Sequence, residues 1–250
     1  MKIMITGSSG FIGRHLTKQL ETEGHEIIGW DRKEGKDIHD FTLEPDTDFV
    51  IHLAADADVR RSIEFPDEYW NNNVTPTTKI QEICFSYCVP LIYASSSCIH
   101  QWHKSPYGIT KKINEETAKP RQVAMRFTTV YGGDGAQRGM FMDKLKDGSL
   151  KYATDHIRDF VHIEDVIDAI KLIMLKLTDS HLFPNAQIKA AYDIGTGKGN
   201  VVSELARIKF PGVDHKYGDD CEAQNNTADI TAIKELGFEA KVDVLEYLNS

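Results

Sequence analysis

Two residues that could exchange a proton, Tyr107 and Lys111, lie four positions apart in the segment "PYGITK". Pro106 can begin a helix, and on that helix the two side chains stand one turn apart on the same face. A phenol with an ordinary pKa near about 10 is a poor base at neutral pH, whereas a nearby ammonium favours the phenolate. We therefore expect the pair to lower the pKa of Tyr107 towards the range used in general acid/base catalysis.

Three hydroxyl side chains precede this pair, in the segment "YASSSCIH". The apolar run "PLIYA" is typical of a buried strand, so Ser95, Ser96 and Ser97 come directly after its carboxyl end. In a parallel sheet, ligands bind at that end of the strands. We expect the three serines to point into a site rather than to serve as ordinary turn residues.

A glycine-rich loop, "TGSSGFIG", follows the first predicted strand and runs into the first predicted helix. Gly7 permits a tight turn, Gly10 lets the backbone approach a pyrophosphate, and Gly13 allows close packing of the helix. The free N–H groups at the start of that helix would meet the phosphates. Asp31 stands where a carboxylate can accept a hydrogen bond from a ribose hydroxyl. The pattern indicates a dinucleotide site; the alternative is a glycine turn in a parallel sheet that binds no dinucleotide.

The choice of cofactor depends on two neighbours at the end of the second predicted strand. Asp31 would repel the extra phosphate of NADP, which favours NAD. Arg32 beside it could instead meet a 2′-phosphate. We expect NAD, with NADP as the alternative. The positive nicotinamide ring would join Lys111 in favouring the phenolate of Tyr107.

Strands and helices alternate through the first half of the chain. "KIMIT" is followed by apolar residues at helical spacing, by Gly24 as a stop and by "EIIGW", which together make a βαβ unit. The alternation continues through "DFVIHLAA", a helical stretch over 74–88, "PLIYA" and "QVAMRF". It predicts an α/β fold, a Rossmann-type doubly wound parallel sheet covered on both faces.

The alternation of predicted strands and helices ends where a second glycine-rich loop, "YGGDGAQRG", begins. A later stretch carries an apolar helical stripe formed by Ile163, Val166, Ile167, Ile170, Met174 and Leu177. The elements after it are short and separated by polar turns. We expect residues 1–130 with 158–180 to form an NAD(P)-binding Rossmann domain, and residues 131–157 with 181–250 to form a small, partly discontinuous substrate-binding lobe.

Composition and charge narrow the classes of partner. The 250 residues include 29 Lys and Arg against 38 Asp and Glu, a formal charge of −9 that argues against nucleic acid or an anionic membrane as the partner. No apolar run approaches membrane-spanning length, and strand-like residues begin where a signal peptide would otherwise lie. The four cysteines pair with no histidine at zinc-ligand spacing, so neither disulfides nor a metal site is expected. These features predict a cytoplasmic location.

Several motifs together resemble those of one family. "TGSSGFIGRHL" resembles its cofactor loop, "DFVIHLAA" and "NNNV" its next strand and helix start, "YASSSCIH" its catalytic serine segment, and "PYGITK" its Tyr/Lys motif. "RFTTVYGG", "RDFVHIEDV" and "ADITAIKELGF" are similar to later motifs of the same family. Over nearly its whole length the chain resembles the extended short-chain dehydrogenase/reductases, in particular the NAD-dependent nucleotide-sugar epimerase/dehydratase group.

The resemblance implies roles for particular residues. Tyr107 would remove a hydroxyl proton as hydride leaves for the nicotinamide, Lys111 would hold the nicotinamide ribose, and Ser96 would hydrogen-bond the reacting oxygen. Arg158 matches a diphosphate-contacting arginine, and Lys216 stands where an arginine is commoner, with a solvated surface lysine as the alternative. The expected substrate contacts are Ser97, Cys98, Arg158 and Lys216. The expected cofactor contacts are Gly7, Ser9, Gly10, Phe11, Ile12, Gly13, Asp31, Arg32, Asp37, Ile38, Leu53, Ala54, Ala55, Asn73, Tyr107 and Lys111.

Two positions depart from the family pattern in a way that bears on the reaction. Family dehydratases carry an acidic pair directly after the catalytic Ser/Thr, where this chain has Ser97 and Cys98, so dehydration is disfavoured. In GDP-fucose synthases a cysteine at the Cys98 position is an acid/base, although those enzymes add a histidine that "GGDGAQRGMFMDKL" lacks. The alternative for Cys98 is a small residue that lines the pocket.

Two segments are short for the family. One lies between Ser97 and Tyr107, where material usually covers the sugar, and the other is the helix that ends before Pro120 and usually builds the dimer interface. The short helix weakens the expectation of a homodimer. The first segment also holds three ring side chains, which are either sugar contacts or exposed loop residues: His100, Trp102 and His103.

The sequence therefore predicts an NAD-dependent nucleotide-sugar epimerase, in the first instance a 4-epimerase, that acts on a UDP- or GDP-sugar. One alternative is an NAD(P)H-dependent reductase or epimerase-reductase of a keto-sugar, resembling GDP-fucose synthase. Another is a non-catalytic dinucleotide-binding sensor, for which the shortened substrate elements would be sufficient. The intact Ser96, Tyr107 and Lys111 set favours the enzyme, because a sensor needs no proton-transfer residue there.

Overall fold

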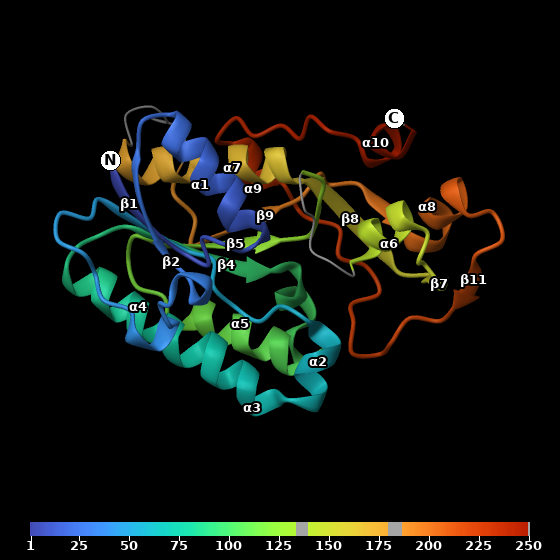
Figure 1. The fold of residues 1–250 in the computed structure, drawn as a ribbon, viewed down its shortest axis with the longest axis horizontal. Helices are drawn as coiled ribbons and strands as arrows, with labels where there is room; N and C mark the ends of the chain where they lie inside the picture. The colour runs from blue at the N-terminus through green and yellow to red at the C-terminus, as the bar shows by residue number, and fades with distance from the viewer. Residues whose placement is uncertain (134–139, 180–186, 250) are drawn as a thin grey trace.

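The computed structural model describes residues 1–133, 140–179 and 187–249. Its largest element is a six-stranded parallel sheet with the strand order β2-β1-β3-β4-β5-β9 (Figure 1). The strands are β1 (Lys2–Thr6), β2 (Glu26–Trp30), β3 (Phe49–His52), β4 (Leu91–Ser96), β5 (Gln122–Phe127) and β9 (Ala191–Ile194). The sheet confirms the predicted α/β fold. Because the order reverses between β1 and β3, a switch point for ligand binding lies at the carboxyl ends of these strands.

Helices cover both faces of the sheet, as Figure 1 shows. One face carries α1 (Phe11–Thr22), α7 (Ile163–Thr178) and α9 (Thr231–Lys234), and the other carries α4 (Thr75–Ser86) and α5 (Pro106–Glu116). Strand β1 serves both cores because successive side chains of a strand point to opposite faces. Ile3 and Ile5 belong to the first core and Met4 to the second. The six residues of the predicted apolar stripe all lie on α7 and pack in or against the first core.

Short helical segments connect these elements. They are the 3₁₀ segments η1 (Arg32–Glu34), η2 (Ile38–Asp40) and η4 (Ser97–Lys104), the α-helices α2 (Val59–Glu64) and α3 (Pro66–Tyr69), and the π-helical η3 (Trp70–Val74). Helix α5 begins as predicted, with Pro106 in its first turn. The Ser105 hydroxyl caps it by accepting a hydrogen bond from the Gly108 N–H at 3.1 Å. This start fixes where the side chains of α5 face.

A smaller set of elements extends from the carboxyl edge of the main sheet. A three-stranded sheet has the order β10-β8-β6, and a two-stranded parallel sheet joins β11 to β7. The elements are β6 (Thr129–Tyr131), α6 (Phe141–Asp147), β7 (Tyr152–Thr154), β8 (Ile157–His162), β10 (Gly199–Val201), α8 (Val202–Lys209), β11 (Asp214–Lys216) and α10 (Val244–Asn249). Strand β8 lies between the two parts, since Val161 packs in the first core and Phe160 in a third core of the smaller part. The predicted domain boundaries stay a prediction.

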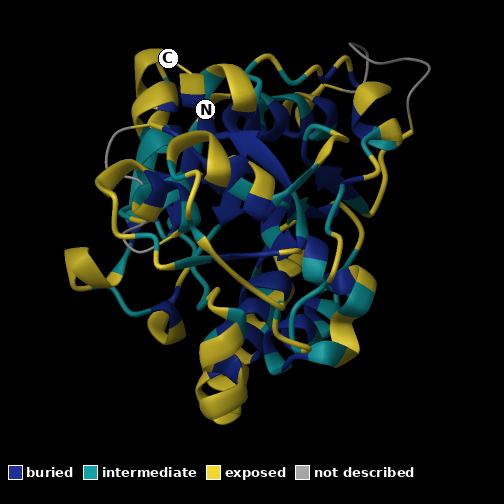
Figure 2. Cartoon of the chain, turned by 90° about the vertical axis from the view of Figure 1, so that its right-hand side faces the viewer, coloured by how far each residue is buried: buried dark blue, intermediate teal, exposed yellow. Residues whose placement is uncertain are grey.

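Figure 2 shows buried strands at the centre of the molecule and exposed residues along the outer sides of the surrounding helices. Strand β3 is buried along its whole length, as expected for a strand covered on both faces. Among the described residues, no helix combines the length and the apolar character needed to cross a membrane.

Candidate active site

The glycine-rich loop joins β1 to α1 at the switch point of the sheet. Gly7 has a left-handed backbone with φ of +70°, and a Cβ there would lie 2.8 Å from the nitrogen of Ala54. A Cβ on Gly13 would lie 2.0 Å from the carbonyl oxygen of Gly7, so α1 starts directly against the loop. Neither position has room for a side chain. A loop of this shape can bring its backbone close to a pyrophosphate.

The N-terminus of α1 is open towards an anion. Its N-cap, Gly10, makes no side-chain capping hydrogen bond, and the first turn carries no acidic residue. The N–H groups of the first turn, which begins with Phe11 and Ile12, thus meet no capping side chain and favour a negative ligand together with the helix dipole. These donors fit the pyrophosphate of a dinucleotide.

Two carboxylates hold the loop from the side of β2. Asp31 follows β2, and its Oδ2 accepts a hydrogen bond from the Ser9 N–H at 3.2 Å. Glu34 accepts hydrogen bonds from the hydroxyls of Ser8 and Ser9 at 3.1 and 3.3 Å. Glu34 is not predicted from the sequence, because nothing in the local pattern shows that η1 folds back over the loop. Both carboxylates stand where the extra phosphate of NADP would meet negative charge.

Arg32 lies away from Ser8 and Ser9. Its guanidinium donates a hydrogen bond to Oδ1 of Asn72 at 3.1 Å and lies 3.8 Å from the carboxylate of Asp37. The Arg32 side chain is 59% exposed, and the positive group on the acidic side of the loop is instead Lys33, whose Nζ donates a hydrogen bond to the Ser9 carbonyl oxygen at 3.2 Å. The two carboxylates of Asp31 and Glu34 are thus only partly offset. The arrangement fits NAD better than NADP.

The other expected cofactor contacts surround the same loop. Ala54, which follows β3 after Leu53, backs Gly7, and Ala55 beside it is half-buried. The buried side chain of Asn73 binds the backbone of Asp56 twice, at 2.8 and 2.9 Å. Ile38 differs from the rest, because its side chain is buried in the second core.

A buried histidine, His52, supports the end of β1, where the loop begins. Nδ1 of His52 lies 2.6 Å from the Thr6 hydroxyl, and Nε2 lies 2.8 Å from the Thr77 hydroxyl, so the ring joins β1 to α4. Burial, together with the nearby charge of Lys111, lowers the pKa of His52 to about 3. The ring is therefore neutral at ordinary pH. In the sequence His52 is simply the last residue of an apolar strand, so its supporting role was not predicted.

The structure brings Ser96, Tyr107 and Lys111 together at the carboxyl end of β4. Ser96 ends the strand and caps η4 by accepting a hydrogen bond from the Cys98 N–H at 3.2 Å. On α5, Nζ of Lys111 lies 5.6 Å from the ring centre of Tyr107, which confirms that the two side chains share one face. The Lys111 ammonium donates a hydrogen bond to the Ala94 carbonyl oxygen at 2.8 Å. All three functional side chains are buried.

The expected lowering of the Tyr107 pKa is wrong for the protein alone. Burial raises the pKa of Tyr107 well above its usual range, and the nearby Cys98 raises it further, while a hydrogen bond with Ser96 lowers it. Burial also lowers the pKa of Lys111 to about 8. Loss of solvent is the largest cause at both groups and disfavours both charged forms. Positive charge near the phenol, from Lys111 and from an oxidised nicotinamide when NAD is bound, would have to offset this loss of solvent.

The expected substrate contacts extend from this trio towards the smaller part of the fold. Ser97 is buried beside Ser96, and Cys98 is half-buried. Burial raises the pKa of the Cys98 thiol, and the charges of Arg158 and Lys111 both act on it. Arg158 therefore lies within electrostatic reach of Cys98, which in turn acts on Tyr107 and Lys111. Lys216 stands farther out on β11, where its ammonium lies 4.3 Å from the ring centre of Tyr152.

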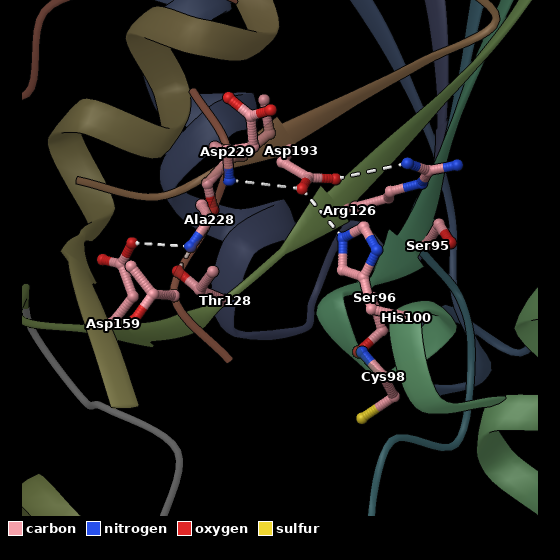
Figure 3. Close-up of polar contacts among 12 residues, drawn as sticks. Ser95, Ser96, Cys98, His100, Arg126, Thr128, Asp159, Asp193, Ala228 and Asp229 are labelled. Atoms are coloured by element: carbon pink, nitrogen blue, oxygen red, sulfur yellow. Dashed lines mark hydrogen bonds and ion pairs between the residues drawn. The ribbon is translucent and has the colours of Figure 1, made fainter. Parts of the chain in front are cut away.

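Ser95 does not behave as its two neighbours do. Its hydroxyl donates a hydrogen bond to Glu115 at 2.6 Å, and Arg126 binds the same carboxylate with its Nε and Nη2 at 3.0 and 2.6 Å. Figure 3 shows the continuation of this network, in which Asp193 contacts Arg126 at 3.4 Å and Nε2 of His100 at 2.8 Å. The network fastens α5 and η4 to the sheet. Glu115 could have been found in the sequence, because it lies one further turn along α5 from Lys111.

The chain matches the model of a known protein family, described as "NAD dependent epimerase/dehydratase family", over residues 3–183. It is 30% identical to Protein CapI of Staphylococcus aureus over an alignment of 233 positions, gaps included, that covers 70% of each chain. It is 26% identical to a UDP-glucose 4-epimerase of Pisum sativum over 331 aligned residues, which cover 98% of this chain and 93% of the relative. Since that alignment is longer than this chain, it contains gaps.

A solved structure, MoeE5 in complex with UDP-glucose and NAD, is similar across the full length of the chain. The TM-score is 0.83 and the sequences are 27% identical, with 100% of this chain and 96% of that chain covered. The same fold, including the smaller part, is therefore found in a protein that binds a nucleotide-sugar and NAD together.

Proposed function

Because the chain belongs to the NAD dependent epimerase/dehydratase family, we propose that it is a nucleotide-sugar 4-epimerase that uses bound NAD as a temporary hydride acceptor. The observation that carries the proposal is the meeting of Ser96, Tyr107 and Lys111 beside the nucleotide loop. Such a trio can take a proton from a sugar hydroxyl and give it back. The pea relative, a UDP-glucose 4-epimerase, aligns with 98% of the chain and supports the same reaction class.

Tyr107 is the residue that moves the proton. In the phenolate form its oxygen accepts the proton of the sugar hydroxyl, while Ser96 donates a hydrogen bond to the sugar oxygen. NAD, when bound, supplies the acceptor for the hydride that leaves the carbon bearing this hydroxyl. After the keto-sugar has turned over, Tyr107 returns the proton to the sugar oxygen, and NAD, if bound, would restore the hydrogen to the carbon from its other face. The substrate is thus neither oxidised nor reduced overall.

Lys111 stabilises the charged form of Tyr107. Its ammonium is buried, and with a pKa lowered to about 8 it still carries its proton at neutral pH. The Ala94 carbonyl at 2.8 Å orients the ammonium near the phenol. Little solvent separates the two groups, so the attraction between phenolate and ammonium is stronger than it would be at the surface.

The residues after Ser96 support epimerisation over dehydration. Elimination of water needs an acid for the leaving hydroxyl and a base for a carbon-bound proton. The two positions that would supply them hold Ser97 and Cys98. Since burial raises the pKa of Cys98, it remains a neutral thiol and is a poor base. Neither side chain offers the carboxylate that the elimination would use.

The proposed substrate is a UDP-hexose, because the pea relative is named for UDP-glucose and MoeE5 was solved with UDP-glucose and with UDP-glucuronic acid. The test is to incubate the protein with NAD and UDP-glucose, UDP-galactose, UDP-glucuronic acid or GDP-mannose, and to follow the sugar protons by NMR. We expect one UDP-sugar to convert to its C4 epimer with no net formation of NADH.

Other products would replace the proposal with a named alternative. A 4-keto-6-deoxy sugar would identify a dehydratase. Stoichiometric consumption of NADH or NADPH by a keto-sugar would identify a reductase and would give Cys98 an acid/base role. Binding of NAD without binding of any nucleotide-sugar would indicate a non-catalytic sensor.

The neighbouring serines provide a matched pair of variants. Ser96→Ala should lower kcat about 50-fold, because it removes a hydrogen bond to the reacting oxygen, and should lower the free energy of unfolding by about 1 kcal/mol, because it removes the cap of η4. Ser95→Ala should leave kcat within about twofold but lower the free energy of unfolding by about 1.5 kcal/mol, since a hydroxyl bound to a carboxylate is lost. Urea unfolding and steady-state kinetics on both variants check that only Ser96→Ala loses activity. The opposite pattern would assign the catalytic hydroxyl to Ser95.

A further inference from the structure

One carboxylate, that of Glu222, lies between two guanidinium groups that come from different parts of the fold. Its Oε1 lies 2.8 Å from Nε of Arg60 on α2, and its Oε2 lies 2.8 Å from Nη2 of Arg158 on β8. Only 19% of the Glu222 side chain is exposed. Arg60 also contacts Asp219, at 2.7 Å. Glu222 therefore links the large part of the fold to the small part through a shared oxyanion.

Further positive charge converges on the same place. Lys104, on η4, donates a hydrogen bond to the Glu222 carbonyl oxygen at 3.2 Å. Lys216 lies over the ring of Tyr152, whose hydroxyl accepts a hydrogen bond from Arg60 at 3.4 Å. A chain with a formal charge of −9 thus gathers cations from four separate elements around one point. Two guanidinium forks around one oxyanion form a binding site suited to phosphate.

The position of this cluster fits a phosphate attached to the reacting sugar. Cys98 is the residue that relates the two, because the charges of Arg158, Glu222 and Lys111 all act on its thiol. Cys98 also acts electrostatically on Tyr107. In a nucleotide-sugar the diphosphate is bonded directly to the sugar ring, so its phosphates must lie within a short reach of the reacting carbon.

We propose that Glu222 is an intramolecular anion that occupies the diphosphate position between Arg60 and Arg158, and that substrate binds by displacing it. Arg60 is then a second substrate-binding arginine, supplied by α2 in addition to Arg158. The inference rests on the proposed function, because it takes a nucleoside diphosphate as the ligand. It adds a residue that binds the ligand and a residue that opposes its binding.

The Glu222 side chain can yield its place while the backbone around it stays. Residues 217–230, all of which the structure describes, form no helix or strand. The part that follows Glu222 is held to β8 by hydrogen bonds, among them Arg158 Nη1 to the Ala223 carbonyl oxygen at 2.7 Å and the Ile157 N–H to the Gln224 carbonyl oxygen at 2.8 Å. Displacement therefore needs a change of the Glu222 rotamer rather than release of the segment. A diphosphate that entered with Glu222 still in place would put like charges side by side. The apparent affinity for the ligand is therefore lower than the intrinsic one, in proportion to the fraction of molecules from which Glu222 has moved away.

Calorimetric titration of the full-length protein with UDP tests the displacement. Glu222→Gln should bind UDP about tenfold more tightly than the unaltered protein. Asp220→Asn is the matched control, because it removes the same charge from an exposed position in the same segment, and it should change the affinity less than about twofold. Equal affinity of Glu222→Gln and the unaltered protein would overturn the proposal. Glu222→Ala serves as a second variant if thermal melting shows that the glutamine is not tolerated.

Arg60 and its neighbour Arg61 form a second matched pair. Arg61 pairs instead with Glu68 on α3, at 2.5 Å. Arg60→Gln should weaken UDP binding about tenfold and reduce its salt dependence, while Arg61→Gln should leave both nearly unchanged. Unchanged binding by Arg60→Gln would remove Arg60 from the site.

Inorganic pyrophosphate separates a failure of this inference from a failure of the proposed function. Tighter binding of pyrophosphate by Glu222→Gln, without turnover of any UDP-sugar, would support the anion site and contradict the epimerase. Turnover of a UDP-sugar, with UDP and pyrophosphate affinities unaffected by Glu222→Gln, would support the epimerase and contradict the displacement of Glu222.

Discussion

Replacement of Tyr107 by phenylalanine should lower kcat about 10³-fold and leave the affinity for NAD within about twofold of the original. In the proposed mechanism the phenol oxygen accepts the hydroxyl proton, and phenylalanine removes that oxygen alone. The ring stays in its buried position against Tyr69, whose ring centre lies 6.3 Å away in an edge-to-face arrangement. A loss of activity would thus report chemistry rather than packing.

Tyr69 provides the matched control. It is also a buried tyrosine, but its hydroxyl donates a hydrogen bond to the Asp58 carbonyl oxygen at 2.6 Å, where α2 begins. Tyr69→Phe should cost about 1 kcal/mol of stability and leave kcat within about threefold. The measurement is the initial rate of epimer formation, with NAD affinity from fluorescence titration. A Tyr107→Phe variant as active as Tyr69→Phe would exclude Tyr107 as the acid/base.

Local pattern was sufficient for the fold and for the shared helix face of Tyr107 and Lys111. The strands and helices alternate along the chain, and residues such as Ile163 and Met174 fall on one face of a helix whatever its surroundings. Tyr107 and Lys111 share a face because helical geometry alone decides it. Pro106 predicts a helix start, and the structure has it in the first turn of α5, because its fixed backbone angle suits that position.

Features that depend on distant contacts could not be predicted in the same way. Arg60 and Glu222 are 162 residues apart, and no spacing rule relates them. The direction of the Tyr107 pKa shift depends on how deeply α5 is buried, which the sequence does not state. Ser95 is the exception, because the alternation of side chains along a strand already implies that it faces away from Ser96, and its hydroxyl binds Glu115.

Gly13→Ala should lower the free energy of unfolding by about 3 kcal/mol and weaken NAD binding about 100-fold. The added Cβ would lie 2.0 Å from the Gly7 carbonyl oxygen and 2.9 Å from Cα of Ser8. Both obstacles are backbone atoms, so no change of rotamer relieves them. The first turn of α1 would have to move away from the loop, and its N–H groups would leave the position in which they can meet a pyrophosphate.

Two other glycines, Gly10 and Gly212, have more room for a Cβ than Gly13, so the three alanine variants can be compared. A Cβ on Gly10 would meet the Gly7 carbonyl oxygen at 3.0 Å, and a Cβ on Gly212 would meet nothing within 4 Å. Stability measured by urea unfolding should therefore fall in the order Gly212→Ala, Gly10→Ala, Gly13→Ala, with the largest loss last. If Gly13→Ala were as stable as Gly212→Ala and bound NAD as tightly as the unaltered protein, the contact between α1 and the loop would not be what shapes the cofactor site. Because the clash involves backbone alone, a larger residue at position 13 should not recover what alanine loses.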